Sequence, residues 1–431
     1  MFWKKEIECI SRSDLDKLQA KQLALSVKRA ANSVVYRERF AKAGITSLDN
    51  MEQLAMLPFT TKDDLRAAFP TGFLCVPLDK AVRLHSSSGT TGNPTVVYHT
   101  MHDLEAWADL VARSLYMTGC RPGDVFQNMM GYGLFTGGLG LHYGAEKLGM
   151  LTIPIGPGNT QRQIWFMQQF RTTVAHILPS YALRLALALA DAKLMPGVDI
   201  KLRTVIIGAE PHTEGVRKKI EEMLCVKAFN CYGLSEMCGP GVAFECQEQD
   251  GLHIWEDHFL VEIIDPQTGE VLPDGQEGEL VLTSLEREAM PLLRYRTRDL
   301  TAVIPGRCGC GRTHRRIRRI KGRDDDMLII NGVNCFPMQI EMVLMKIPGV
   351  GNNYVIELRK ENHMDKLTVK VEVHETMFKG TLEDLEKLEQ HIAALLKAEI
   401  LFTPYVRLVE PGSIPVAEGK VKRVIDLRKT E

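Results

Sequence analysis

The sequence predicts an α/β protein with a large N-terminal α/β domain, which includes a small β-barrel-like part, and a small C-terminal α+β domain. A length of 431 residues exceeds what one hydrophobic core usually serves, so two domains are expected. From residue 82 onward, short apolar runs alternate with helix-like stretches, which is typical of strands buried on both faces. The segment KGRDDD at 321–326 follows a basic run and indicates a boundary between domains 1–323 and 324–431.

The N-terminal domain is expected to begin with helices. Residues 14–43 have a helical pattern, and TTKDDLRAAF at 60–69 predicts a helix with a threonine cap and an acidic first turn. Buried strands are expected at 124–130, 149–155, 173–179 and 203–210. Residues 258–285 differ, because Asp-Pro, Thr-Gly-Glu and Asp-Gly turns join their apolar runs. This region is therefore expected to form a meander or a small distorted barrel.

The C-terminal domain has the pattern of a compact α+β unit. A strand (MLIING), a helix (PMQIEMVLMKI), two strands (YVIELRK and KLTVKVEVHE) and a helix at 381–399 are expected in that order. The tail then passes through a further strand into an exposed loop that contains Gly419 and Lys420. The chain shows no internal repeat and no low-complexity tract.

Composition narrows the class of protein. The hydrophobic content of 45% is enough for a large core, and the net charge of −1 favours neither nucleic acid nor an anionic membrane as a partner. The basic run 312–321 is short and contains isoleucines, so nucleic-acid binding is not expected. The first 30 residues lack the apolar core of a signal peptide, and no window approaches 18 apolar residues. Ten scattered cysteines suit reduced thiols, so a cytoplasmic protein is expected.

The loop SSSGTTGNPT, from Ser86 to Thr95, is the first segment that suggests chemistry. Its small residues leave backbone N–H groups free to face a polyanion, and its hydroxyls add donors, so the loop can cradle phosphate. It lacks the Gly-Lys-Ser/Thr ending of a Walker A loop, which disfavours the P-loop mechanism. On composition alone, a flexible surface loop remains the alternative.

This loop resembles the phosphate loop of the ANL superfamily of acyl-CoA synthetases, non-ribosomal adenylation domains and luciferases. The other signatures of that superfamily follow in order: Gly208-Ala209-Glu210-Pro211, Tyr232-Gly233-Leu234-Ser235-Glu236, Tyr295-Arg296-Thr297-Arg298-Asp299, Gly322-Arg323-Asp324-Asp325 and Gly419-Lys420. The segments at 131–149, 253–259 and 322–337 are similar to the phenylacetate-CoA ligase branch. The resemblance covers nearly the whole chain and implies an ANL fold with a mobile C-terminal domain.

The resemblance also implies the reaction. ATP would activate a small aryl carboxylic acid, with phenylacetate the best expectation among arylacetic acids, to an acyl-adenylate. Transfer to coenzyme A would then give the aryl-acyl-CoA, AMP and pyrophosphate. The alternatives are an adenylyltransferase related to coenzyme F390 synthetase, and a CoA ligase for indoleacetate or benzoate-type acids. A nucleotide-binding regulator without activity is disfavoured, because Lys420, Glu236 and Asp299 are intact.

Individual roles follow from the same resemblance. The nucleotide would contact Ser87, Ser88, Gly89, Thr90, Thr91, Gly92, Gly208, Ala209, Glu210, Pro211, Tyr232, Gly233, Ser235, Asp299 and Arg323. Coenzyme A would pass along Gly332, Val333 and Asn334. Glu236 is expected to bind Mg2+, because a carboxylate is a hard oxygen ligand, with a helix-cap role as the alternative.

Three further residues are expected to act in the two half-reactions. Asp299 suits the ribose hydroxyls, with an ion pair to Arg296 or Arg298 as its alternative. Lys420 would stabilise the charge that develops during adenylation. Asp325 is the expected hinge, with Asp324 as the close alternative.

The chain departs from the superfamily pattern in the phosphate loop. Many phosphate loops of this superfamily carry lysine where this loop has Asn93 and Thr95, so backbone N–H groups, hydroxyls and basic residues such as Arg323 are expected to compensate. The aryl-acid pocket is expected near Tyr132, Phe135 and Gly137, with Ala209 and Tyr232 at its edge, although each aromatic ring could equally belong to the core. A homodimer is compatible with the resemblance, but the sequence shows no interface.

A separate set of cysteines and histidines predicts a structural zinc site. Cys246, His253, Cys308 and Cys310 are the expected ligands, with His314 as the leading substitute. Soft ligands on two turn-rich segments suit tetrahedral zinc, although Cys-x-Cys is less usual than Cys-x2-Cys. The alternative is a set of free thiols.

Overall fold

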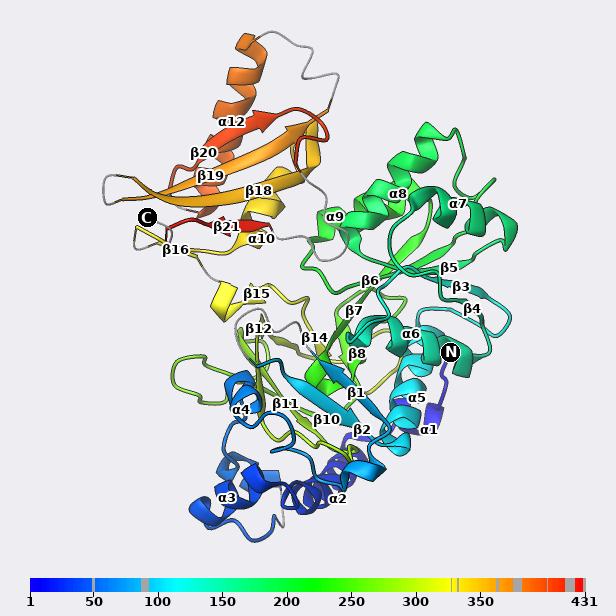
Figure 1. Ribbon diagram of the computed structural model, residues 1–431, viewed down its shortest axis with the longest axis vertical. Coiled ribbons are helices and arrows are strands. Elements are labelled where there is room, and N and C mark those ends of the chain that lie inside the picture. The colour runs from blue at the N-terminus through cyan, green and yellow to red at the C-terminus, as the bar shows by residue number, and fades with distance from the viewer. Residues whose placement is uncertain are drawn as a thin grey trace. The chain divides into compact units, whose positions relative to one another are not determined.

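The computed structural model describes residues 1–48, 51–86, 93–326, 328–331, 333–361, 364–374, 382–400, 402–414 and 423–428. The chain forms two compact units (Figure 1). The first comprises Met1–Ile177, Ile200–Ala209 and Phe229–Ile320, and the second comprises Leu178–Asp199, Glu210–Ala228 and Lys321–Glu431. The predicted α/β class is confirmed, and the division at residue 323 stays a prediction.

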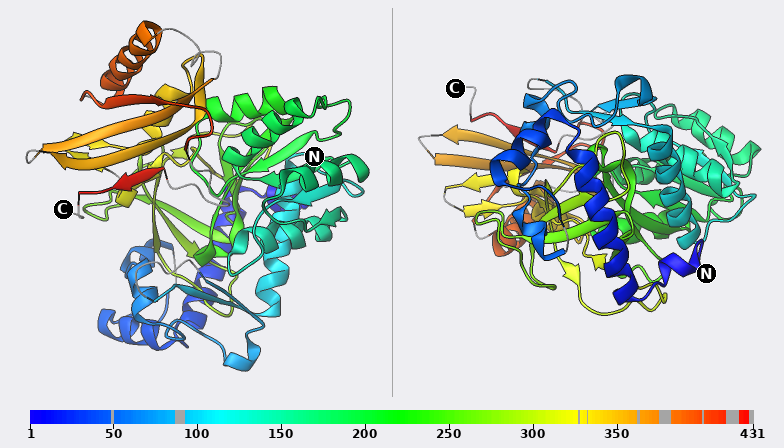
Figure 2. Two further views of the ribbon diagram at one scale, coloured as in Figure 1. Left: turned by 45° about the horizontal axis from the view of Figure 1, so that its top comes forward. Right: turned by 90° about the horizontal axis from the view of Figure 1, so that it is seen from below.

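The first unit begins with helices α1 (Lys5–Glu8), α2 (Arg12–Ala30) and α3 (Val34–Ala43), the turn η1 (Met51–Met56), helix α4 (Lys62–Ala67) and the turn η2 (Leu78–Lys80). The helix expected at 14–43 is interrupted, because the Ser33 side chain accepts a hydrogen bond from the Tyr36 N–H and starts a new helix. The expected cap of α4 is confirmed, since Thr61 and Asp64 form a capping box. Figure 2 shows α2 running across the sheet that contains β11, where Ser26 Oγ donates to the Ser284 carbonyl at 2.7 Å.

A nine-stranded sheet carries most of the first unit. Its order is β13-β14-β9-β8-β7-β6-β5-β3-β4, and β4, β3, β5 and β6 pair in parallel. The strands are β3 (Val125–Asn128), β4 (Leu151–Ile153), β5 (Val174–Ile177), β6 (Thr204–Ile207), β7 (Lys227–Leu234), β8 (Gly239–Glu245), β9 (Leu252–Ile254), β13 (Val303–Ile304) and β14 (Arg316–Ile317). Helices α5 (Met101–Met117), α6 (Thr136–Leu148) and α7 (Thr160–Gln169) lie between the early strands. The buried parallel strands confirm the pattern expected from residue 82 onward.

Two smaller sheets complete the first unit. Strands β10 (Phe259–Ile264), β11 (Gly278–Ser284) and β12 (Tyr295–Thr301) pair antiparallel, which confirms the meander expected at 258–285. Strands β1 (Arg83–Ser86) and β2 (Val96–His99) form an antiparallel pair on either side of the phosphate loop. The turn η3 (Ser235–Met237) lies between β7 and β8.

The second unit contains the rest of the chain. Its helices are α8 (Pro179–Asp191), α9 (Glu214–Leu224), α10 (Pro337–Leu344) and α12 (Leu382–Ile400). Its strands are β15 (Gly322–Arg323), β16 (Leu328–Ile330), β17 (Val333–Cys335), β18 (Val350–Glu361), β19 (Met364–Val373), β20 (Tyr405–Val409) and β21 (Val424–Asp426), and η4 (Asp324–Asp326) is a short turn. A four-stranded sheet runs in the order β20-β19-β18-β21, and Ile392 and Leu396 of α12 are buried in its core.

No helix in the described part of the chain is long and apolar enough to cross a membrane.

Candidate active site and metal cluster

Two of the predicted nucleotide motifs meet in the first unit. The Tyr232 hydroxyl, near the end of β7, donates to Asp299 Oδ2 on β12 at 2.5 Å. The Arg296 guanidinium bonds to the Glu279 carboxylate at 2.5 and 3.0 Å, and the alternative pairing of Asp299 with Arg298 stays a prediction. The hydrogen bond from Tyr232 to Asp299 joins two residues that are 67 positions apart and places the Asp299 carboxylate beside the end of β7.

Main-chain packing around Tyr232 requires small residues. A Cβ atom at Gly233 would lie 1.8 Å from the Gly239 carbonyl oxygen, so this position admits only glycine. A Cβ atom at Gly208 would lie 2.6 Å from the Cys231 carbonyl oxygen, which places the end of β6 directly against β7. Of the predicted adenine-facing residues, Gly208 therefore lies beside the Tyr232 motif within one compact unit.

Glu236 lies in the turn η3 with 4% of its surface exposed. Its Oε1 atom lies 3.4 Å from Thr95 Oγ1 and 3.6 Å from Lys62 Nζ. Arg287 donates to the Glu236 main-chain oxygen at 2.6 Å and so holds the turn in place. The carboxylate therefore contacts side chains that are remote in sequence, and a purely local helix-cap role does not account for its position.

The neighbouring predicted residue, Ser235, contacts helix α6. Its hydroxyl lies 3.3 Å from the Thr136 hydroxyl, so the motif at 232–236 is tied to the first turn of that helix. The predicted substrate residues lie just before and within the same turn. The Tyr132 hydroxyl is 3.2 Å from His142 Nδ1, and burial raises the pKa of Tyr132 to about 12.

The other two predicted substrate residues are more open. Phe135 is 53% exposed and precedes the first residue of α6. A Cβ atom at Gly137 would meet only Met130 Cε, at 3.9 Å, so the space beside this position is loosely filled. His142 was not anticipated from the sequence, where it is one of several polar residues in a glycine-rich stretch.

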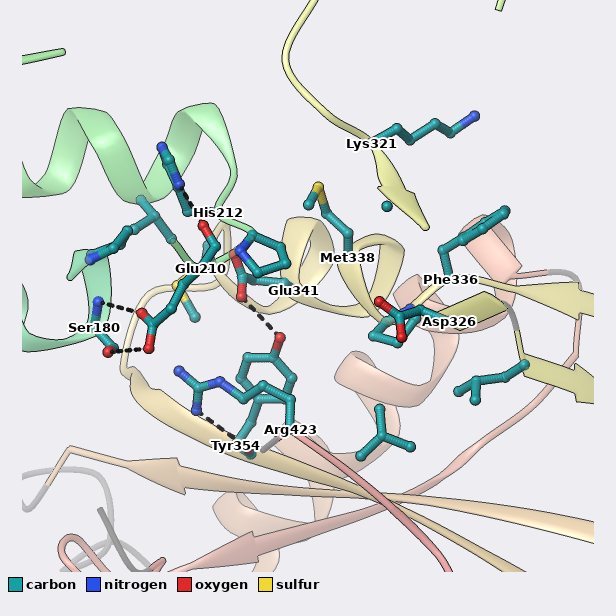
Figure 3. A pocket seen from close by; sticks show the side chains of 18 of the residues that line it. Ser180, Glu210, His212, Lys321, Asp326, Phe336, Met338, Glu341, Tyr354 and Arg423 are labelled. Atoms are coloured by element: carbon teal, nitrogen blue, oxygen red, sulfur yellow. Dashed lines mark hydrogen bonds between the residues drawn. The ribbon is translucent and has the colours of Figure 1, made fainter. Parts of the chain in front are cut away.

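A cavity of about 450 Å3 lies in the second unit (Figure 3). Its walls include Pro179, Ser180, Leu183, Glu210, Pro211, His212, Val216, Lys321, Gly322, Asp326, Leu328, Phe336, Pro337, Met338, Glu341, Met345, Tyr354, Arg423 and Val424. The volume is within the usual range for a small-ligand site. The predicted residues Glu210 and Pro211 thus face a ligand-sized space.

Polar side chains in this cavity are held by specific hydrogen bonds. Ser180 donates from its N–H and its hydroxyl to the Glu210 carboxylate at 3.2 and 3.0 Å. The buried Glu341 carboxylate accepts from the Tyr354 hydroxyl at 2.9 Å, and Figure 3 shows these two side chains turned toward each other. Burial raises the pKa of Glu341. The Arg423 guanidinium lies 4.5 Å from the centre of the Tyr354 ring.

Several predicted residues lie outside the described part of the chain. These are Ser87, Ser88, Gly89, Thr90, Thr91, Gly92, Gly332 and Lys420. The side chains of Asp325 and Asn334 are also outside it, although Asp325 belongs to η4 and Asn334 to β17. Ala209 follows β6 with a φ of 64°, Arg323 lies in β15, and Val333 begins β17.

The four predicted zinc ligands come together in the first unit. The ligand atoms of Cys246, His253, Cys308 and Cys310 all lie within 4.8 Å of one another. The two closest recorded pairs are Cys246 Sγ to Cys308 Sγ at 3.6 Å and Cys310 Sγ to His253 Nε2 at 3.4 Å. The pKa of the Cys310 thiol is lowered because the Cys246 thiol donates to it and His253 adds positive charge. This donor set fits a tetrahedral zinc ion.

His314 cannot replace one of these ligands. Its Nδ1 atom accepts a hydrogen bond from the Glu256 N–H at 2.9 Å, and its Nε2 atom faces the Ile7 carbonyl oxygen at 3.0 Å. Instead, the His314 carbonyl oxygen lies 3.1 Å from His253 Nδ1. That contact fixes the His253 ring so that Nε2 faces the thiols, as metal-binding histidines are usually held.

The loop that carries two of these cysteines also binds the N-terminal segment. Arg312 Nε donates to the Glu8 carboxylate at 2.7 Å, and both side chains are buried. Thr313 donates from its N–H to the Glu8 carbonyl at 3.1 Å and from its hydroxyl to the Ile10 carbonyl at 2.6 Å. The first ten residues are thus fastened to the loop that carries Cys308 and Cys310.

Comparison with known proteins agrees with this arrangement. Residues 20–285 match the family of AMP-binding enzymes, and residues 332–428 match the AMP-binding enzyme C-terminal domain. The phenylacetate-coenzyme A ligase of Thermus thermophilus is 47% identical over 100% of both chains, and that of Escherichia coli K12 is 44% identical over 98% of this chain and 97% of its own. A crystal structure of 2-hydroxyisobutyryl-CoA ligase with 2-HIB-AMP is 30% identical, with a TM-score of 0.93 over 100% of this chain and 93% of its own.

The fold and the meeting of the nucleotide motifs define an adenylate-forming enzyme of the ANL superfamily. Within it, the chain belongs to the family of phenylacetate-coenzyme A ligases. It is an acid–thiol ligase that uses ATP and coenzyme A, which confirms the family and the class of reaction expected from the sequence motifs.

Proposed function

We propose that the acid activated by this ligase is an arylacetic acid, with phenylacetate as the first choice. The observation that carries the proposal is the identity of 44–47% to four ligases named for phenylacetate, over at least 98% of this chain. The half-buried Tyr132 and the open space beside Gly137, next to the Tyr232 motif, support a flat apolar ligand here. Nothing observed favours the adenylyltransferase alternative.

The reaction has two balanced steps. A carboxylate oxygen of the acid attacks the α-phosphorus of ATP, so a new P–O bond forms while the bond to the bridging oxygen breaks and pyrophosphate leaves. The thiol of coenzyme A, after losing its proton, then attacks the acyl carbon, so a C–S bond forms while the bond from the acyl carbon to the phosphate oxygen breaks and AMP leaves. Both steps bring anions together, which explains the need for cations and N–H donors around the α-phosphate.

Within this reaction, we assign roles to the described residues. Asp299, held by Tyr232, is proposed to accept the ribose hydroxyls. Gly208 and Gly233, whose close backbone contacts leave no room for a side chain, are proposed to contact the nucleotide, and so are Ala209, Glu210 and Pro211. Glu236 is a hard oxygen donor next to Thr95, at the end of the phosphate loop, and is proposed to hold Mg2+. When bound, the ion would neutralise phosphate charge.

The remaining roles rest on the sequence resemblance. Lys420 is proposed as the adenylation lysine, Asp325 as the hinge, Arg323 as a nucleotide contact, and Gly332, Val333 and Asn334 as the lining of the coenzyme A channel. Domains 1–323 and 324–431 are proposed to act as the fixed and the mobile part.

We further propose that Cys246, His253, Cys308 and Cys310 hold a structural zinc ion. Their clustered ligand atoms support it, and so does the hydrogen bond that orients His253. Zinc would stabilise the loop that fastens the N-terminal segment. A cytoplasmic location is supported by ten cysteines without a disulfide. A homodimer stays an expectation.

The activity assay compares acids with purified protein. AMP release is measured with ATP and each acid of a panel (phenylacetate, hydroxyphenylacetates, indoleacetate and benzoate), with and without coenzyme A. We expect phenylacetate to give the highest kcat/KM, and we expect AMP release to depend on coenzyme A. A higher kcat/KM with benzoate or indoleacetate would refute the choice of acid. AMP release that ignores coenzyme A would favour the adenylyltransferase alternative.

A further inference from the structure

The phosphate loop presents a charge deficit. The ten residues from Ser86 to Thr95 contain no lysine and no arginine. Backbone N–H groups and hydroxyls can cradle phosphate oxygens, but they do not neutralise a polyanion. Binding a triphosphate and releasing pyrophosphate both gain from a full positive charge close to the terminal phosphates. A basic side chain close to the loop would therefore add to the charge of the Mg2+ ion proposed at Glu236.

Lys62 lies where such a cation is needed. Its Nζ atom is 3.6 Å from Glu236 Oε1, and the same oxygen accepts from Thr95 Oγ1 at the end of the phosphate loop. The Lys62 side chain is 35% exposed, so a ligand can reach it. At 3.6 Å the ammonium is attracted to the carboxylate without a short hydrogen bond, which leaves its N–H donors available to phosphate.

Arg287 is also close, but it has a different task. Its guanidinium donates to the main-chain oxygens of Glu236 at 2.6 Å and Tyr98 at 3.0 Å. These bonds tie β2, which leaves the phosphate loop, to the turn that carries Glu236. Arg287 thus organises the backbone, whereas Lys62 presents its charge at the carboxylate.

The backbone that carries Lys62 is fixed to the nucleotide site. The residue two positions earlier, Thr60, is fully buried, and it exchanges main-chain hydrogen bonds with Arg294 and Arg296 at 3.1 and 2.9 Å. The Thr60 hydroxyl also donates to the Leu293 carbonyl at 2.9 Å. Thr60 therefore pairs with the start of β12, the strand that carries Asp299.

An ion pair between Arg39 and Asp64 also joins helix α4 to helix α3. Asp64 caps the helix through Thr61 and pairs with Arg39 at 2.5 Å. Lys62 begins this capped helix, so its ammonium projects from a rigid platform and not from a loose surface loop.

We propose that Lys62 is the cation that binds the terminal phosphates of ATP and the departing pyrophosphate. The proposal rests on ATP binding beside Glu236, as the function above requires. A group that contacts only the β- and γ-phosphates acts on ATP and pyrophosphate but not on AMP. A residue that merely balances the charge of Glu236, or one with a structural role only, does not make that distinction.

The test measures binding of MgATP, AMP and inorganic pyrophosphate by calorimetry, without any acid, so it does not depend on which acid is the substrate. Lys62→Met keeps the aliphatic stem and removes the charge, and Lys62→Arg keeps the charge. Arg66→Ala removes a charge from the same helix and is the matched control. We expect Lys62→Met to weaken the binding of MgATP and of pyrophosphate by roughly tenfold to a hundredfold, because each loses a charged hydrogen bond. AMP binding should stay within about twofold, and Lys62→Arg should recover most of the affinity.

The same variants separate the two half-reactions. Lys62→Met should slow formation of acyl-adenylate from ATP, and thioester formation from preformed acyl-adenylate should be unchanged. Unchanged MgATP and pyrophosphate affinities in Lys62→Met would overturn the proposal, as would an equal loss for AMP. A wild-type enzyme that binds MgATP but activates no acid of the panel would refute the choice of acid and leave the binding result valid.

Discussion

Replacing Cys308 with serine should abolish zinc binding. Zinc holds thiolate sulfur at about 2.3 Å and imidazole nitrogen at about 2.0–2.1 Å, so the ligand atoms of a tetrahedral site lie roughly 3.5–3.8 Å apart. The recorded separations are 3.6 Å from Cys246 to Cys308 and 3.4 Å from Cys310 to His253. These two of the six separations match a zinc site, and all four ligand atoms lie within 4.8 Å of one another.

The assay is metal analysis of purified, dialysed protein. The wild type should carry about one zinc per chain, and Cys308→Ser should carry far less, because serine is a poor zinc ligand. Cys225→Ser, at an exposed cysteine outside the cluster, is the control and should keep its zinc. Hydrogen exchange adds a second readout. Loss of zinc should increase exchange in residues 1–10, because Arg312 and Thr313 fasten that segment to the loop that carries Cys308 and Cys310.

Thermal unfolding gives the expected magnitude. An ion present at about a thousand times its Kd stabilises the folded state by about 4 kcal/mol, so strong chelation should lower Tm by several degrees. A wild type with well under one zinc per chain would refute the site. A Cys308→Ser variant that keeps its zinc would show that the ligands are chosen wrongly.

Three further outcomes follow from other parts of the chain. Lys420→Ala should raise the activation barrier of adenylation by about 2–4 kcal/mol yet still convert preformed acyl-adenylate to thioester. Equal loss of both half-reactions would contradict the role of Lys420. Gly233→Ala should lower the free energy of unfolding and the rate of adenylation, because its Cβ would lie 1.8 Å from a carbonyl oxygen of β8. Gly131→Ala is the control: a Cβ at Gly131 meets open space, so thermal unfolding and kinetic assays should show little change. Arg113 lowers the pKa of buried Asp257 to about 2, from an ordinary value of 3.8, despite the cost of desolvation. The ionised Asp257 carboxylate should therefore add about 2 kcal/mol to the free energy of unfolding above pH 4, and this contribution should be lost as the pH falls toward 2. Asp257→Asn should lack this pH-dependent component when unfolding is measured across the acid range.

Local features of the fold were accessible from the sequence because they depend on near neighbours. The cap of α4 needs only Thr61 and a carboxylate three residues later, and the structure contains both hydrogen bonds. The helical pattern at 14–43 is confirmed except at residues 31–33, where the Ser33 side chain accepts from an N–H three residues later and starts a new helix. A single serine is a weak signal within an otherwise helical pattern, because serines also occur inside helices.

The residues of the nucleotide site also divide into those that the sequence identified and those that only the structure brought out. The motif residues Tyr232, Glu236 and Asp299 were identified because the types and order of these residues are specific to the family. The contacts of Lys62 with Glu236 could not be predicted, because 174 positions separate the two residues and a lysine after a threonine cap is usually solvated. The sequence showed that the phosphate loop lacks a cation and brought out Arg323 as a compensating residue, but it gave no signal for Lys62.

Residue types and their order along the chain identified the class of enzyme and brought out Cys246, His253, Cys308 and Cys310 as candidate metal ligands. Folding then fixed which groups surround these residues. His314 is excluded as a ligand because both ring nitrogens already have partners, and Lys62 enters the nucleotide site because Thr60 pairs with the start of β12. The physical reason is that residue type limits which bonds a side chain can form, whereas its partner is fixed by strands that meet only after folding.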